Sequence, residues 1–353
     1  RHPRLGRWSR GLGDVYKRQI YAETGTLNMA DLAQRVALIS PEETVGIRVA
    51  AVLLLLVFAI KAALVPLHFW LPSSYAEAPA PVAALFAIMT KVGAYAIIRV
   101  YTLIFPPGQD VTSGLHDLWL QPAALISLAI GTVGVLAAKK LDRLVAFSVV
   151  GSMGMVMVAI SFFSPEGIAA ALYYIVHSTL AGAILFLVSD LVRTGRGNVD
   201  LTAQPPMKGT ALTSGMFFVA AIAMAGLPPL SGFLGKLLVL NAAFDTALVV
   251  WVWAIVLLSS LVSVVGFARA GSVVFWKAHG ISDDTPVDGV SRPSMLSYVA
   301  VGGLVALLVA HTAFAGQVHG YTTEMARELF APDTYMSVVL DTPGKLSTPK
   351  EGH

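Results

Sequence analysis

Two lysines lie inside long apolar stretches of this sequence. Lys61 directly follows the apolar run 49–60, and Lys91 lies in the middle of the apolar segment 80–105. A lysine at the centre of a membrane helix costs about 2.5–3.5 kcal/mol on insertion scales, so two of them in neighbouring helices need an explanation. Each lysine could snorkel to the membrane surface, but the apolar residues on both sides oppose this. We therefore expect a transmembrane helix bundle in which these charges face a wet cavity.

Prolines interrupt two of the predicted helices. The first break, KAALVPLHFWLP at 61–72, contains Pro66 and His68, and the second, AGLPPLSGFLGK at 225–236, ends at Lys236. Proline removes a helical hydrogen bond, and the backbone groups that it frees are tolerated at membrane depth only inside protein or beside water. Paired breaks of this kind point to a translocation site built from inverted repeats. The alternative for Lys236 is that it only caps carbonyl groups freed by the break.

Composition supports a polytopic membrane protein of the all-α class. Hydrophobic residues make up 56% of the chain and charged residues 13%, against about 25% charged residues in an average soluble domain. About eight spans are predicted, two of them discontinuous. They are 45–65, 80–105, 122–138, 144–163, 168–192, 211–244 with its break, 247–267 and 294–314.

The sequence lacks the motifs of most enzyme classes. It contains no cysteine, which excludes disulfides, thiolate metal sites and cysteine nucleophiles, and it has no GxGxxG, P-loop or CxxC motif. The net charge is +3, but six basic residues fall within the first eighteen positions, so this charge does not indicate nucleic-acid binding. We therefore expect neither a cofactor nor a metal site, and the buried lysines beside the breaks favour an ion path over an enzyme active site.

The chain is predicted to have five parts. Residues 1–19 are polar, basic and glycine-rich, and we interpret them as a non-native leader outside the fold. The alternative is a disordered basic arm on the membrane surface. Residues 20–105 contain the first break and 106–278 the second, 279–314 form a loop and the last span, and 315–353 form a polar tail whose last part, 341–353, is expected to be disordered.

Loop charges predict the orientation of the spans. Lys and Arg accumulate on the cytoplasmic side of membrane proteins, and every second loop is basic, at 139–143, 193–208 and 269–292. The loops between them, at 106–121, 164–167 and 245–246, contain neither Lys nor Arg. The C-terminal tail is therefore expected to be extracytoplasmic.

Four segments together resemble the proton-conducting antiporter-like family that respiratory complex I shares with the multisubunit Mrp-type Na+/H+ antiporters. They are KAALVPLHFWLPSSYAEAPAPVAALFAIMTKVGAYAIIR at 61–99, KLDRLVAFSVVGSMG at 140–154, YYIVHSTLAGAILFLVSD at 173–190 and AGLPPLSGFLGKLLVLNA at 225–242. Segments 24–33 and 269–276, together with the lysine at 236, look most like the D subunit of the Mrp-type antiporter. The resemblance covers about 20–314.

The resemblance implies about fourteen transmembrane helices in two inverted five-helix repeats, each with one discontinuous helix. Ser152 stands where some relatives have histidine, so a relay through it would need its hydroxyl or a water, and His68 is a further possible contributor. The family's glutamate partner of Lys61 has no counterpart in this sequence, so five or six more helices with a buried Glu are expected upstream. The implied proton relay consists of Lys61, Lys91, His177 and Lys236.

The predicted function is that of a proton-translocating membrane subunit of a multisubunit Na+/H+ antiporter in the bacterial cytoplasmic (inner) membrane. Other membrane subunits would be its partners, and H+ and Na+ its substrates. The alternative is a proton-pumping subunit of complex I or a related hydrogenase. A structural subunit without transport is the third possibility, in which His177 only hydrogen-bonds between helices. Outside the relay, His311 is expected at the membrane interface, and Asp190 and Arg193 are expected to form a helix-end pair.

Overall fold

The computed structural model describes residues 17–39, 45–109, 116–281 and 291–341. Most of the predicted leader, the end of the tail after Asp341, and parts of the loops at 106–121 and 279–293 lie outside the described residues. The chain divides into two compact units, which we describe separately: unit 1 is 1–54, 99–113 and 327–353, and unit 2 is 55–98 and 114–326.

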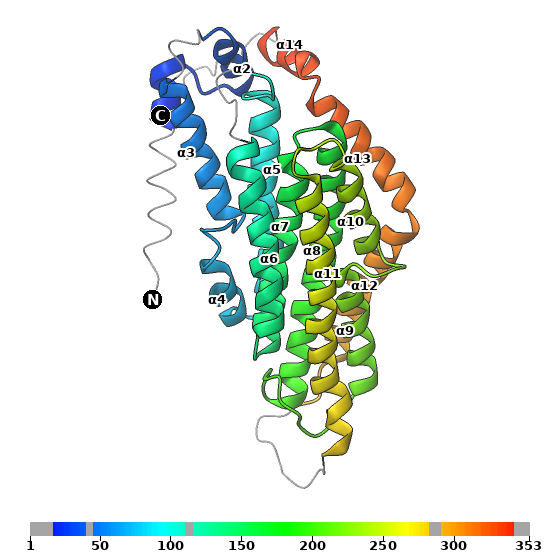
Figure 1. Ribbon diagram of the computed structural model, residues 1–353. Coiled ribbons are helices and arrows are strands. Elements are labelled where there is room, and N and C mark those ends of the chain that lie inside the picture. The colour runs from blue at the N-terminus through cyan, green and yellow to red at the C-terminus, as the bar shows by residue number, and fades with distance from the viewer. Residues whose placement is uncertain (1–16, 40–44, 110–115, 282–290, 342–353) are drawn as a thin grey trace, which may run out of the picture. The chain divides into compact units, whose positions relative to one another are not determined.

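The described residues form helices joined by short loops, and the predicted all-α class is confirmed (Figure 1). Among the described residues, the only β-type pairing is an isolated antiparallel bridge between Lys140 and Asp200. The α-helices are α2 (Met29–Ala37), α3 (Val45–Lys61), α4 (Trp70–Glu77), α5 (Ala80–Leu103), α6 (Gln121–Ala137), α7 (Leu141–Ser161), α8 (Pro165–Arg196), α9 (Thr210–Ala225), α10 (Ser231–Ala242), α11 (Val249–Gly271), α12 (Met295–Ala313), α13 (Ala315–Leu329) and α14 (Asp333–Asp341).

Six helical stretches in the described residues are long and apolar enough to cross a membrane: Ala80–Leu103, Leu118–Ala137, Leu141–Ser161, Pro165–Arg196, Val249–Trp276 and Met295–Ala313. They correspond to six of the predicted spans. Short π-helical segments extend two of these stretches, His116–Leu120 before α6 and Ser272–Trp276 after α11. The other two predicted spans are the interrupted ones, where α3 ends at Lys61 and where α9 and α10 share one span.

Other helices satisfy the backbone groups of the first break. The Val65 N–H donates to the Ser127 hydroxyl of α6 at 2.8 Å, and the Trp70 indole N–H donates to the Ile60 carbonyl at 2.9 Å. At the second break, Gly226 has φ +78°, a left-handed conformation that only glycine adopts at little cost, and its N–H closes the last turn of α9. Each break contains one cis peptide bond, Val65–Pro66 and Pro228–Pro229.

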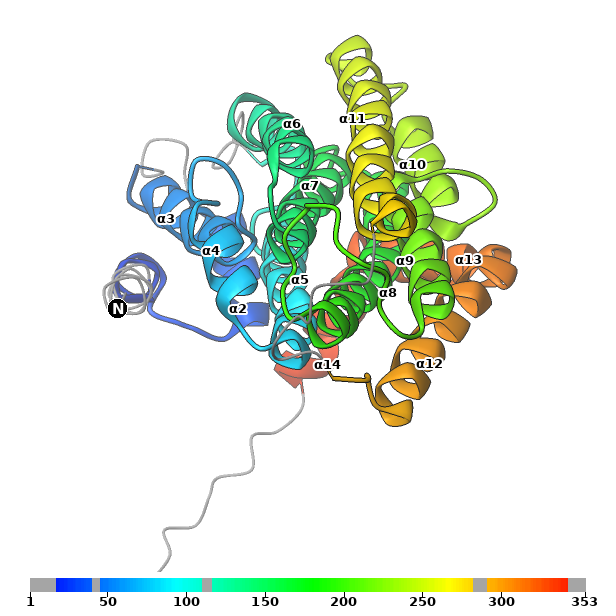
Figure 2. The same cartoon turned by 90° about the horizontal axis from the view of Figure 1, so that it is seen from below.

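Helix α7 forms the centre of unit 2. In the most apolar stretch of α7, 94% of the residues are buried inside the protein, against 17% in the corresponding stretch of α12. It packs between α6 and α8, as the view along the helices shows (Figure 2). Small residues permit this packing: a Cβ at Gly131 of α6 would collide with the backbone of Gly151 in α7, so the two helices approach closely.

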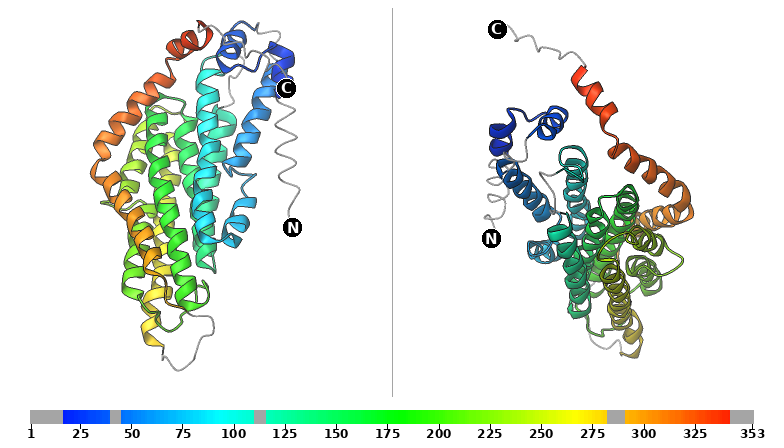
Figure 3. Two further views of the ribbon diagram at one scale, coloured as in Figure 1. Left: turned by 180° about the vertical axis from the view of Figure 1, so that it is seen from behind. Right: turned by 45° about the horizontal axis from the view of Figure 1, so that its top comes forward.

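The predicted polar tail contains two helices in its described part. Helix α13 follows α12, which lies along α8 in unit 2 (Figure 3). Helix α14 packs against α2 in unit 1, where the Arg99 guanidinium lies 4.3 Å from the centre of the Tyr335 ring. At the other end of the chain, residues 17–24 are helical, so the last residues of the predicted leader belong to a helix.

Candidate functional site

Three of the predicted relay residues are buried inside unit 2. The exposed fraction is 4% for Lys91 on α5, 0% for His177 on α8 and 7% for Lys236 on α10. All three side chains therefore face the bundle interior, as predicted. Both lysines are close enough to His177 for their charges to act on its ring, so the three groups form one electrostatic cluster.

Lys236 is held by the break that precedes it. Its Nζ donates to the Ala225 carbonyl, the last residue of α9, at 2.6 Å, and to the Ser260 hydroxyl of α11 at 2.8 Å. The lysine stem lies over Gly226, where an added Cβ would come within 2.6 Å of Cδ. Because the C-terminal end of a helix carries partial negative charge, α9 stabilises an ammonium at this position.

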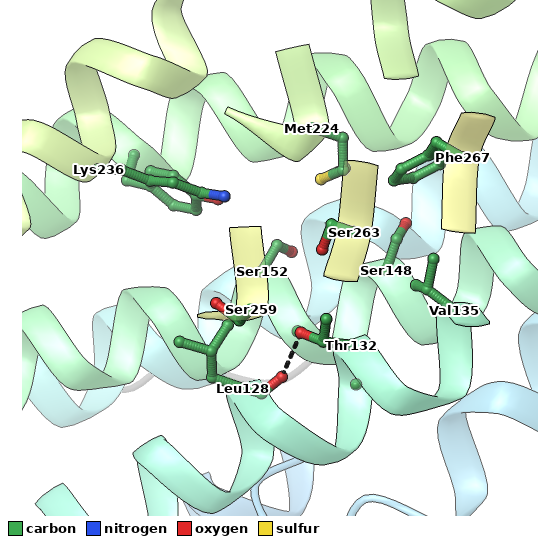
Figure 4. A pocket seen from close by; sticks show the side chains of 13 residues that line it. Leu128, Thr132, Val135, Ser148, Ser152, Met224, Lys236, Ser259, Ser263 and Phe267 are labelled. Carbon is green, nitrogen blue, oxygen red and sulfur yellow. Dashed lines mark hydrogen bonds between the residues drawn. The ribbon is translucent and has the colours of Figure 1, made fainter. Parts of the chain in front are cut away.

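A small polar cavity adjoins Lys236, lined by hydroxyl groups of α6, α7 and α11 (Figure 4). It leaves about 20 Å³ for the centres of water molecules, and about 10–15 Å³ suffices for one. The predicted contributor Ser152 lies in this wall. The other hydroxyl and aromatic side chains in the lining are Thr132, Ser148, Tyr174, Ser259, Ser263 and Phe267.

The hydroxyls of this cavity present oxygen lone pairs to it. Thr132 donates its own hydrogen to the Leu128 carbonyl at 2.6 Å, a bond drawn in Figure 4, and Ser148 and Ser152 donate to carbonyls three residues earlier in α7. Ser259 does the same in α11. Since the hydrogens of these four hydroxyls are already used, their oxygens are left as acceptors. The cavity therefore favours hydrogen-bond donors and cations such as water, hydronium or the Lys236 ammonium.

His177 connects α8 with the start of α10. Its Nδ1 lies 2.9 Å from the Ser231 hydroxyl. Its ring also lies beside the Ala223 carbonyl, although its buried Nε2 forms no hydrogen bond of good geometry within the described residues. The Ser231 N–H in turn donates to the Thr312 hydroxyl of α12 at 3.0 Å. Close contact requires glycine at 232, because a Cβ there would lie 2.8 Å from the imidazole and would collide with the Ala223 carbonyl.

Lys91 has no hydrogen-bond partner among the described residues, although its Nζ is buried. An uncompensated buried ammonium is unfavourable, and ionisable groups at such positions in membrane proteins are usually functional. Gly93, on the same helix, brings α5 against the first break, since a Cβ there would lie 2.8 Å from the Ala62 nitrogen and 3.0 Å from the Phe58 carbonyl.

The structure does not bring the remaining predicted residues into this cluster. Lys61 is exposed at the end of α3, and His68 is half-buried within the first break, with its Nδ1 buried and unpartnered among the described residues. No contact in the described residues joins either one to His177 or Lys236. Their roles remain predictions.

Sequence reasoning missed the groups that hold the cluster together. Ser231, Ser260 and Thr312 are serines and threonines within apolar helices, a pattern too common to single them out. The structure buries the His311 side chain, which is 6% exposed and whose ring lies 4.6 Å from that of Tyr173; its predicted position at the membrane interface stays a prediction.

The predicted pair of Asp190 and Arg193 is wrong. Arg193 donates instead to Asp142 at 2.9 Å and so connects α8 to the start of α7. The two acids compete for one arginine, and the packing of α7 against α8 places Asp142 nearer to it.

Residues 18–263 match the transmembrane family described as NADH:quinone oxidoreductase/Mrp antiporter. The chain belongs to this family. Its membership, together with the six apolar helices, makes it a multi-pass membrane protein.

Two curated relatives resemble the chain over most of its length. It is 33% identical to the D subunit of a probable K(+)/H(+) antiporter of Rhizobium meliloti (strain 1021), over 92% of this chain and 64% of the relative. It is 35% identical to the D subunit of the Na(+)/H(+) antiporter of Bacillus subtilis (strain 168), over 91% and 63%. The chain thus spans slightly less than two thirds of these relatives.

A solved structure supports the fold. A chain in the Mrp complex from Dietzia sp. DQ12-45-1b superposes with a TM-score of 0.81 at 24% identity, covering 94% of this chain and 68% of that chain. At this level of identity the likeness concerns the fold alone.

Proposed function

We propose that this chain carries protons in a multisubunit monovalent cation/proton antiporter of the bacterial cytoplasmic membrane. The observation that supports this best is the buried Lys236, which is bound to the second break and adjoins a cavity lined by hydroxyl oxygens. Both curated relatives are named as the D subunit of a cation/proton antiporter, one for Na+ and one for K+. Other membrane subunits are the proposed partners.

In this proposal Lys236 exchanges protons with water in the hydroxyl-lined cavity. Ser152 lines that cavity and has an oxygen free to accept, so it fills the role proposed for its position without needing a histidine. His177 would pass protons along the cluster through its two ring nitrogens. Lys91 would be the next carrier towards the first break, where Lys61 would exchange protons with a partner outside this cluster.

The proposed organisation follows the two breaks. Residues 20–105 would complete one repeat and 106–278 would form the other, followed by the last span and the tail. Loop charges support a tail on the extracytoplasmic side. The names of the curated relatives favour the antiporter over a complex I subunit, although the matched family includes both.

Exchange in inverted membrane vesicles tests the proposal, with the chain in its complete complex. Lys236→Ala is expected to abolish proton release on addition of Na+ or K+ while the complex still assembles. Lys236→Arg is expected to restore little, because arginine does not deprotonate in proteins. Lys208→Ala, a change at an exposed loop lysine, is the control. Normal exchange by assembled Lys236→Ala would refute the proposal.

Lys61→Ala provides a separate test of the first break. If Lys61 carries protons there, exchange is expected to stop with assembly intact, and Lys61→Arg is expected to rescue poorly. An assembled Ala variant with normal exchange would mean that the Lys61 side chain only extends towards the membrane surface.

A further inference from the structure

Helix α12 brings a second histidine to the buried cluster, and the proposed relay does not use it. His311 is 6% exposed, and its ring packs on Tyr173 of α8 with 4.6 Å between ring centres. It is close enough to His177 for a charge on one ring to act on the other. The next residue, Thr312, accepts the hydrogen bond from the Ser231 N–H, so α12 contacts both groups around His177.

His311 extends the buried cluster from His177 towards the start of α8. Tyr173 precedes His177 by four residues, about one helical turn nearer to the start of α8. The hydroxyl-lined cavity lies beside this part of α8, because Tyr174 lines it together with Ser148 and Ser152 near the middle of α7. His311 thus adds a titrating group beyond His177 on the α12 side.

The hydroxyl oxygen of Tyr173 is buried and has no hydrogen-bond partner among the described residues. The His177 and His311 rings lie beside the backbone carbonyls of Ala223 and Tyr173, but neither Nε2 forms a hydrogen bond of good geometry within the described residues. Buried polar atoms in native proteins are nearly always paired, and those that are not need a functional explanation. Two imidazoles and a phenol are groups that both accept and donate protons. Ring packing alone would be served equally well by phenylalanine at both 173 and 311.

We propose that His311 is the proton carrier that follows His177 towards the end of the bundle where α8 begins. The proton leaves the His177 imidazolium and reaches His311 through the Tyr173 hydroxyl, which accepts it on oxygen and passes its own hydrogen on. His177 then becomes neutral and His311 becomes the imidazolium, which releases the proton at that end. Helix α12 thereby belongs to the conducting path as well as to the packing around α8. This inference rests on the proposed proton-carrying function.

The test uses the complete complex in inverted vesicles. His311→Phe keeps an aromatic ring against Tyr173 and removes both titrating nitrogens. It is expected to lower the exchange rate about 100-fold or more, as is typical when a proton-transferring side chain is removed, with normal assembly. Added imidazole is expected to restore part of the rate. His319→Phe, which changes a half-buried histidine of α13, is the control and is expected to exchange normally.

An exchange rate in assembled His311→Phe within about twofold of the unchanged protein would overturn the inference, since the usual loss on removing a proton-transferring group is far larger. If the Phe variant does not assemble, His311→Gln is judged by the same threshold. If neither assembles, Tyr173→Phe keeps both histidines and the stacked rings. An unchanged rate in that variant, with no solvent isotope effect on exchange, would likewise overturn it.

Lys236→Ala is measured in parallel. If this variant still exchanges protons, the proposed function fails. If Lys236→Ala stops exchange while His311→Phe exchanges normally, only the role of His311 is refuted.

Discussion

At the scale of single residues, the two buried lysines differ in the number of hydrogen-bond acceptors around their ammonium groups. Lys236 has two acceptors, a helix-end carbonyl and a serine hydroxyl, whereas Lys91 has none among the described residues. Hydrogen bonds to the charged form favour it, so the two lysines differ in how well an ammonium is compensated. Under the proposed function this difference suits them to different steps of proton transfer.

Removing the Ser260 hydroxyl should weaken the hold on the Lys236 ammonium. Ser260→Ala leaves only the Ala225 carbonyl as acceptor, and the lost charged hydrogen bond corresponds to about 1.5–3 kcal/mol. We expect cation-dependent proton exchange to slow and its pH profile to move, measured in vesicles over a range of pH. Ser214→Ala, at an exposed bond on α9, should change neither, and the idea fails if both variants behave alike.

At the scale of elements, the second break depends on glycines that let α10 approach its neighbours. Gly226 provides the left-handed turn after α9, and Gly232 leaves room for the His177 ring and the Ala223 carbonyl. The break is thus shaped by the absence of side chains as much as by its prolines. A helix end placed this close to a histidine cannot shift without changing the His177 contact with Ser231.

Gly232→Ala should therefore disturb the relay and the stability of the fold together. Its methyl group has no room, and overpacking of this kind costs about 1–3 kcal/mol. We expect a lower melting temperature of the purified complex and a large loss of exchange. Gly303→Ala on α12, where a Cβ would meet nothing within 4 Å, should lower neither. Equal melting temperatures for the two variants would show that the break can expand.

At the scale of the whole molecule, the loop charges predict which ends of the helices share a side of the membrane. Thr202 lies in a loop expected to be cytoplasmic and Asp245 in one expected to be extracytoplasmic, and both are exposed. Because this chain contains no cysteine, Thr202→Cys and Asp245→Cys each introduce one thiol. We expect an impermeant thiol reagent added to intact cells to label Asp245→Cys only, and inverted vesicles to show the reverse. The opposite pattern would invert the proposed orientation.

Much of the architecture follows from local sequence. In a bilayer every backbone group must be paired within its own segment, so apolar runs of sufficient length become helices, and prolines within them become breaks. Lys91, His177 and Lys236 could be recognised because a titrating group within an apolar run is costly to insert and is usually retained for a function. The helices at 315–341 were missed since they are short and neither apolar nor strongly punctuated by turn residues.

Only the tertiary structure decided which partners these residues have. Ser231 meets His177 across 54 positions and Thr312 across 81, and His311 reaches Tyr173 from the last span. Helices that are apolar all round show no hydrophobic face from which the inward side could be identified. The same ambiguity hid the packing of His311 on Tyr173 and led to the wrong partner for Arg193. The sequence by itself thus determined where the helices form, because a long apolar segment in a bilayer must pair its own backbone groups. The tertiary structure decided which side chains contact the proposed relay residues, because those contacts arise from packing between helices distant in sequence.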